Sequence, residues 1–236
     1  MSSARTEASP AQKFKWMAVG ALVGIILGLL ASLLVRPPIV VDNRLLIELG
    51  QDDAVHAVFL GGSLTDSRFA TSESAGFRPL VADGLGVPVD ETRGNAASES
   101  KLEAVALNAQ IPATTNLVII ELGSTDVYVN RTDPQQFSAD YRDVLNRVRL
   151  LAPSSQITCL GVWGGSQNVA TYDKLMSDRC FAVGGAFVPL ADIYETPGMK
   201  GPAGLDVYQG ISDDFHPNDA GYSAIAQRIL GTLRTE

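Results

Sequence analysis

The chain has 236 residues, of which 26 are acidic and 18 are basic, giving a net charge of −8 at neutral pH. This acidic balance, without a basic stripe, argues against nucleic acid as a partner. About 195 residues follow the N-terminal segment, which is enough for one compact domain with a sizeable core.

An uncharged apolar segment, residues 16–35, is the first predicted element. Twenty helical residues at about 1.5 Å each match the ~30 Å hydrocarbon layer of a membrane, so we expect a transmembrane helix. Arg5, Lys13 and Lys15 precede it, and the positive-inside rule therefore leaves the tail at 1–15 in the cytoplasm.

A cleaved signal peptide is the main alternative to this anchor, and a buried core helix is a more distant one. The best cleavage candidate, Leu29-Leu30-Ala31, has leucine at the −3 position, where a signal peptidase requires a small residue. We therefore expect a retained single-pass anchor in the cytoplasmic membrane, a linker at 36–53 and an extracytoplasmic domain at 54–236.

Short apolar strands alternate with amphipathic helices over the rest of the chain. Strands are predicted at 54–60, 87–91, 117–122, 156–162 and 186–190. Asp133-Pro134 starts a helix that Ala152-Pro153 ends, and a last helix starts near Asn218 or Asp219. This alternation predicts a three-layer α/β/α domain with a parallel sheet, in which ligands bind at the carboxyl ends of the strands.

The chain has two histidines, and one of them is placed to act as a base. His56 lies in the apolar run 54–60 and is predicted to belong to a buried strand. His216 follows Asp213 by three residues and precedes Pro217, so a turn can hold the carboxylate against one ring nitrogen and leave the other free. This segment indicates an oriented general base that works near neutral pH.

A nucleophile for this base follows the first predicted strand. Gly61 and Gly62 allow a sharp turn there, which exposes the hydroxyl of Ser63 at the edge of the sheet. On its own, a Gly-Gly-Ser turn is more often structural than catalytic. Residues 94–100 and Thr125 follow the second and third strands and fall at the same edge, and this convergence favours the catalytic interpretation.

Together these segments resemble the SGNH/GDSL hydrolase family, over about residues 54–222. Three blocks carry the resemblance: Gly61-Gly62-Ser63-Leu64 for Gly-Asp-Ser-Leu, Gly123-Ser124-Thr125-Asp126 for Gly-x-Asn-Asp, and Asp213-Asp214-Phe215-His216 for Asp-x-x-His. A fourth block is expected at 93–100. The resemblance implies a flavodoxin-like arrangement of five parallel strands and a catalytic triad of Ser63, Asp213 and His216.

Two positions depart from the family's motifs. Gly62 stands where the family has aspartate, and Thr125 stands where the family has the asparagine that donates to the oxyanion. The resemblance implies an oxyanion hole made by the backbone N–H of Ser63, that of Ser98 or Ser100, and the side chain of Thr125. Losing one such donor lowers the rate on the order of 100- to 1000-fold, so a threonine that does not reach the oxyanion would slow the reaction.

Other side chains suggest further contacts. Trp163, at the end of the fourth strand, is a candidate for substrate binding, with core packing as the alternative. Cys159 and Cys180 are either a disulfide, which an oxidising compartment permits, or two separate buried thiols. Asp213-Asp214 reads as a turn rather than a metal site, and the chain has no CxxC or Cys/His spacing for zinc.

The sequence therefore predicts a serine esterase or acylhydrolase that needs no cofactor. Its expected substrate is a small-molecule, lipid or glycan ester, and cell-envelope glycans or lipids are inferred from location alone. An O-acyltransferase of the same fold is one alternative. Another is a weak or inactive domain that binds glycans or proteins, which the departures at Gly62 and Thr125 favour.

Overall fold

The computed structural model describes residues 42–94 and 101–236. The anchor predicted at 16–35 and the candidate oxyanion residues Ser98 and Ser100 lie outside the described residues. Within these two described ranges, no helix is both long and apolar enough to cross a membrane.

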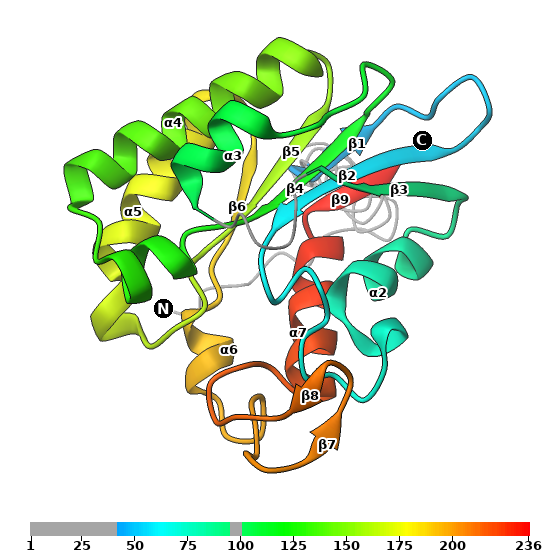
Figure 1. Ribbon diagram of the computed structural model, residues 1–236. Coiled ribbons are helices and arrows are strands. Elements are labelled where there is room, and N and C mark those ends of the chain that lie inside the picture. Colours follow the sequence, from blue (N-terminus) through cyan, green and yellow to red (C-terminus); the bar gives the residue numbers. More distant parts are fainter. Residues whose placement is uncertain (1–41, 95–100) are drawn as a thin grey trace, which may run out of the picture. The chain divides into compact units, whose positions relative to one another are not determined.

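A five-stranded parallel sheet organises residues 43–236, which form one structural unit (Figure 1). Its strands are β2 (Val55–Gly61), β3 (Val89–Arg93), β4 (Leu117–Glu121), β5 (Gln156–Leu160) and β6 (Ala186–Val188). They lie in the order β3-β2-β4-β5-β6, and each neighbouring pair is parallel. The predicted strands are confirmed, and their order is the one typical of flavodoxin-like folds.

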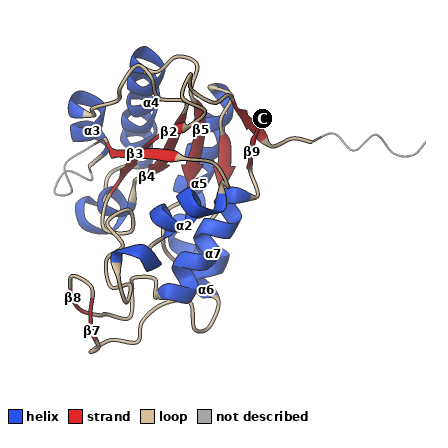
Figure 2. Ribbon diagram, turned by 90° about the vertical axis from the view of Figure 1, so that its right-hand side faces the viewer, coloured by secondary structure: helices blue, strands red, loops and turns tan. Residues whose placement is uncertain are grey.

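Helices cover both faces of the sheet. One face carries α3 (Leu102–Asn108), α4 (Pro134–Leu151) and α5 (Ser166–Ala182), whereas the other carries α2 (Phe77–Gly84), α6 (Ala191–Glu195) and α7 (Asp219–Leu230). Figure 2 shows α2 and α7 side by side on the second face. The strands supply both halves of the core because successive side chains point to opposite faces: Val58 of β2 packs toward α4, and Phe59 packs toward α2.

Two helices begin where the sequence predicts, and a polar side chain caps each of them. The carboxylate of Asp133 accepts the first free N–H groups of α4, and Asn218 accepts the N–H of Gly221 at the start of α7. Asn218 also donates its amide to the carbonyl oxygens of Gly198 and Gly201, at 2.9 and 3.0 Å. This cap therefore fixes the end of the loop that precedes α7.

Several short elements have no clear sequence pattern. β1 (Leu45–Ile47) pairs in parallel with β9 (Leu233–Thr235), so part of the segment expected to be a linker belongs to the fold. β7 (Asp206–Val207) and β8 (Gly210–Ile211) form an antiparallel hairpin. Helical turns also occur at η1 (Glu73–Ala75) and η2 (Thr125–Asn130). Segments of two to six residues are too short for hydrophobic periodicity to reveal them.

His56 differs from its predicted environment. It lies in β2 but is only half-buried, because its ring hydrogen-bonds the exposed carboxylates of Asp52 and Asp90. The hydrogen bond with Asp52 raises the pKa of His56 above its usual value, although desolvation opposes it. The residue lies near the start of β2, away from the turn that follows the end of this strand.

Cys159 of β5 and Cys180 of α5 are joined as a disulfide, with their Cα atoms 6.3 Å apart. Both residues are fully buried. The bond ties α5 to β5, the strand next to the central one.

Candidate active site

Ser63 lies in a tight turn directly after β2. The backbone N–H of Arg68 donates to the carbonyl oxygen of Ser63 at 3.0 Å, which closes the turn. Gly61 leaves no room for a side chain, because an added Cβ would lie 1.8 Å from Oγ1 of Thr65. The turn places Ser63 on the wall of a cavity of about 460 Å³.

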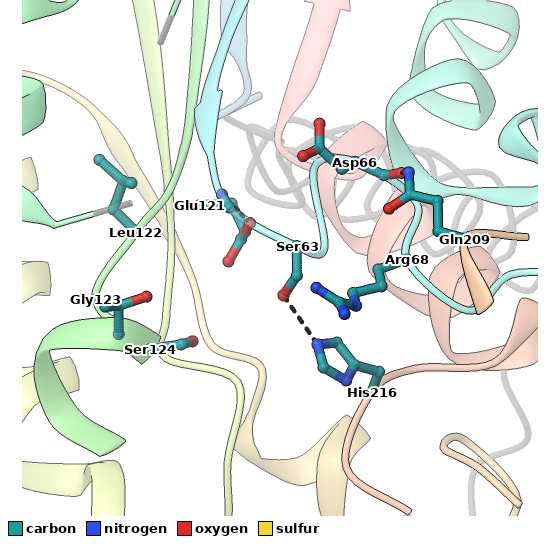
Figure 3. Close-up of a pocket in the computed structure, with 11 residues that line it drawn as sticks. Ser63, Asp66, Arg68, Glu121, Leu122, Gly123, Ser124, Gln209 and His216 are labelled. Carbon is teal, nitrogen blue, oxygen red and sulfur yellow. Dashed lines mark hydrogen bonds between the residues drawn. The ribbon is translucent and has the colours of Figure 1, made fainter. Parts of the chain in front are cut away.

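His216 connects Ser63 to Asp213. Its Nε2 lies 2.9 Å from the hydroxyl oxygen of Ser63 (Figure 3), and its Nδ1 lies 2.8 Å from one oxygen of the Asp213 carboxylate. The other carboxylate oxygen accepts the backbone N–H groups of Phe215 and His216, at 2.9 and 2.8 Å. Because an ionised carboxylate only accepts, Nδ1 carries the ring proton and Nε2 is free to accept the serine proton.

Burial controls the protonation of this pair. The side chain of His216 is 14% exposed, and Phe69 and Phe215 pack edge-on against its ring. Burial lowers the pKa of His216, with the hydrogen bond to Asp213 opposing and the charge of Arg68 reinforcing the effect. For Asp213, desolvation alone would raise the pKa, but hydrogen bonds from His216 and Phe215 outweigh it, so the pKa is lowered. At neutral pH the pair is a neutral imidazole beside a carboxylate, which is the form a general base needs.

Glu121, the last residue of β4, holds the serine turn through its buried carboxyl group. Oε2 accepts the backbone N–H of Gly62 at 3.0 Å, and the N–H and hydroxyl of Thr65 at 3.2 and 3.1 Å. Burial raises the pKa of Glu121 to about 7, even though the three hydrogen bonds lower it. The sequence assigns this residue no role. Its position at the carboxyl end of a buried strand is the signal that marks it.

The remaining cavity wall comes from both sides of Ser63. In Figure 3, Leu122, Gly123 and Ser124 lie on one side, and Asp66, Arg68 and Gln209 lie on the other. Thr125, the predicted oxyanion residue, also lines the cavity beside Ser124. Gln209 reaches the site from the turn between β7 and β8, and no sequence motif marks it, Asp66 or Arg68.

Trp163 does not line this cavity, so its prediction as a substrate-binding residue is wrong. The side chain is 1% exposed, and its indole N–H donates to the backbone carbonyl of Phe215 at 2.7 Å. Its ring also packs edge-on against Tyr194. Core packing is therefore the correct alternative, and the tryptophan supports the segment that carries His216.

A serine, a histidine and an aspartate hydrogen-bonded in series, with the serine directly after a strand of the parallel sheet, form the arrangement used by hydrolases with a serine nucleophile. The chain belongs to the GDSL-like lipase/acylhydrolase family, whose model matches residues 59–224. The matched range contains the Ser63 turn, Thr125 and the segment from Asp213 to His216. No curated protein sequence matches the chain.

Solved structures with the same fold include two carbohydrate esterases from Clostridium thermocellum. The family 3 enzyme is 14% identical with a TM-score of 0.57, over 75% of this chain and 93% of that one. An active-site mutant of a family two enzyme is 16% identical with a TM-score of 0.52, over 78% of this chain and 66% of that one. Phospholipase A1 from Streptomyces albidoflavus NA297 is 18% identical with a TM-score of 0.52, over 75% of this chain and 98% of that one. These likenesses show the fold alone.

Proposed function

We propose that this protein is a serine esterase in which Ser63 is the nucleophile, His216 the general base and Asp213 the residue that orients the imidazole. The observation that carries the proposal is the continuous chain of hydrogen bonds, 2.9 and 2.8 Å long, from hydroxyl to imidazole to carboxylate. Membership of a lipase and acylhydrolase family supports the same chemistry.

In the first half-reaction, Oγ of Ser63 attacks the ester carbonyl carbon as Nε2 of His216 takes its proton. The tetrahedral intermediate collapses when His216 returns this proton to the leaving alcohol, and an acyl-enzyme remains. Water then attacks the acyl carbon by the same route in reverse, releasing the acid and restoring the serine. Delivery of the acyl group to an alcohol instead of water would give the related transferase activity.

The developing oxyanion needs donors close to Ser63. We assign this role to the backbone N–H of Ser63, to that of Ser98 or Ser100, and to the hydroxyl of Thr125. Threonine has a shorter reach than the family's asparagine. We therefore expect a lower catalytic rate than in family members that carry asparagine.

The proposed substrates are esters of glycans or lipids with a small acyl group. Most side chains on the cavity wall are polar or charged, which favours a hydrophilic substrate over a long acyl chain. Carbohydrate esterases and a phospholipase A1 share the fold and are consistent with these substrate classes.

A hydrolysis assay tests the proposed function directly. Full-length protein should hydrolyse p-nitrophenyl acetate and react with a fluorophosphonate probe, and Ser63→Ala should lose both properties. Ser177→Ala, which changes a serine of α5, is the matched control and should keep both. Equal turnover by Ser63→Ala would exclude the assigned nucleophile.

We also propose that residues 16–35 anchor the protein in the cytoplasmic membrane with the catalytic domain outside. The uncharged segment and the basic residues before it support this topology. An anchored protein should resist extraction by high salt and alkaline carbonate but dissolve in detergent, because an inserted apolar helix does not depend on ionic contacts. A soluble form that begins near residue 32 would show instead that the segment is a cleaved signal peptide.

A further inference from the structure

Arg68 brings a positive charge to the cavity that contains Ser63. Figure 3 shows its guanidinium extending toward the serine hydroxyl and lying beside the ring of His216. The side chain is exposed, and among the described residues that line the cavity it is the only lysine or arginine. A guanidinium in this position can contact a substrate directly.

The backbone holds Arg68 at this place. Its N–H donates to the carbonyl oxygen of Ser63 at 3.0 Å, and its own carbonyl accepts the hydroxyl of Tyr222 at 2.6 Å. The residues on either side, Ser67 and Phe69, have φ angles of 58° and 65°, in the left-handed region that non-glycine residues rarely adopt. Strain of this kind persists where the surrounding structure enforces it, and it clusters at functional sites.

Contacts beyond the backbone also place the guanidinium. It lies over the ring of Phe69, 5.0 Å from the ring centroid, and that ring packs edge-on against His216. The N–H of Phe69 donates to the carbonyl oxygen of Tyr208 in the β7–β8 turn. The ring of Phe69 and the β7–β8 turn therefore hold the charge close to the reacting serine.

No carboxylate of the described chain forms an ion pair with Arg68. The two acids of the cavity wall are engaged elsewhere: Nη1 of Arg93 lies 2.7 Å from the carboxylate of Asp66, and the buried carboxyl of Glu121 accepts hydrogen bonds from Gly62 and Thr65. Asp213 is engaged by His216 and the backbone. In a protein with a net charge of −8, this leaves an uncompensated cation beside the nucleophile.

We propose that Arg68 binds a carboxylate or phosphate group of the substrate and so selects esters that carry a negative charge near the scissile bond. Guanidinium groups pair with both oxyanions through two parallel N–H donors. Arg68 lies across Ser63 from Gly123 and Ser124, which precede Thr125 (Figure 3), so this subsite is separate from the proposed oxyanion donor. The inference rests on the proposed esterase function and adds the class of substrate.

Paired substrates test the selectivity. The mono-p-nitrophenyl ester of succinate carries a carboxylate, its methyl diester is the neutral match, and the p-nitrophenyl ester of 3-phosphonopropionate carries the phosphate-type group. The ratio of kcat/KM for each anionic ester to that for the neutral one should fall by about tenfold or more in Arg68→Gln, and less in Arg68→Lys. Arg142→Gln, an exposed arginine of α4, should leave every ratio unchanged.

An unchanged ratio in Arg68→Gln would overturn the proposal, as would an equal fall for charged and neutral esters. The latter result would assign Arg68 to the oxyanion or to the fold. A loss confined to one anionic ester would identify which oxyanion the site takes.

A binding experiment separates this inference from the proposed chemistry. Monomethyl succinate, an unactivated anionic ester, should bind the Ser63→Ala protein in calorimetry, and Arg68→Gln in that background should weaken binding by about tenfold or more. If Ser63-dependent hydrolysis is missing but this binding depends on Arg68, the esterase proposal fails and the anion subsite stands. If the protein hydrolyses the ester but Arg68→Gln does not weaken the binding of monomethyl succinate, only the subsite proposal fails.

Discussion

Replacing Glu121 with glutamine tests whether a buried, titrating carboxyl holds the serine turn. The glutamine keeps an oxygen that can accept the N–H groups of Gly62 and Thr65, but it cannot ionise. In the folded chain, burial raises the pKa of Glu121 from 4.5 to about 7. The folded state therefore keeps a proton that the unfolded state has lost. The contribution of this group to the free energy of unfolding is therefore most favourable below the unfolded pKa, and it falls as the pH rises through about 7.

The size of the effect follows from the shift. One pKa unit corresponds to about 1.4 kcal/mol, so a carboxyl that titrates near 7 instead of 4.5 costs the folded state about 3 kcal/mol once it is ionised. Most of this cost, about 2 to 3 kcal/mol, develops between about pH 5 and about pH 8. The difference in unfolding free energy, Glu121→Gln minus wild type, should grow by that amount over the interval, whatever its sign at the acidic end.

Urea unfolding at several pH values measures this difference. The pH dependence of all other groups cancels between the two proteins, because both contain them. Glu103→Gln, at an exposed position of α3, is the matched control and should give a much flatter difference. A flat difference for Glu121→Gln as well would show that the buried carboxyl titrates no differently in the two states, which refutes the burial argument.

Three other predictions concern the oxyanion, the base and the disulfide. Thr125→Val should lower kcat with little change in KM, and Thr125→Asn should preserve or raise kcat; an unchanged kcat in the valine variant would make the threonine a bystander. His216 must be neutral to accept a proton, and burial lowers its pKa. The value of kcat/KM should therefore rise with pH, with its midpoint below the usual imidazole pKa of about 6.5. A midpoint above that value would contradict the assignment. Changing both Cys159 and Cys180 to alanine opens a loop with a sequence separation of 21, and it should lower the unfolding free energy by about 3 kcal/mol. Urea titrations measure this change, and an unaltered urea midpoint would refute the prediction.

The regular part of the fold could be predicted because its signals are local. β4 and β5 are apolar runs bounded by turn residues, and Asp133 supplies a cap whose side chain reaches the first N–H groups of α4. The β1–β9 pair could not be predicted, since its two strands have three residues each and lie at opposite ends of the described unit. Only tertiary contact makes them strands.

The same division applies to the site. Asp213 and His216 lie three residues apart, and the chain has only two histidines, so residue type and spacing were enough to choose them. Arg68 and Gln209 are 141 positions apart and line the same cavity because the β7–β8 turn folds back onto the serine turn, where the Gln209 amide donates to the backbone carbonyl of Asp66 at 2.7 Å. A contact between residues so far apart in the chain cannot be predicted from their spacing in the sequence.

The register of the central strands explains why the serine turn and the buried acid constrain each other. β2 and β4 pair so that Gly61 lies opposite Glu121, which brings the carboxyl within hydrogen-bonding distance of the turn that follows. A Cβ on Gly61 would lie 2.9 Å from Oε2 of that carboxyl and still closer to Thr65, which the carboxyl also binds. The glycine is therefore required by its partner on the next strand as much as by the turn. A change at either position has to be judged by whether it displaces the hydroxyl of Ser63 from His216.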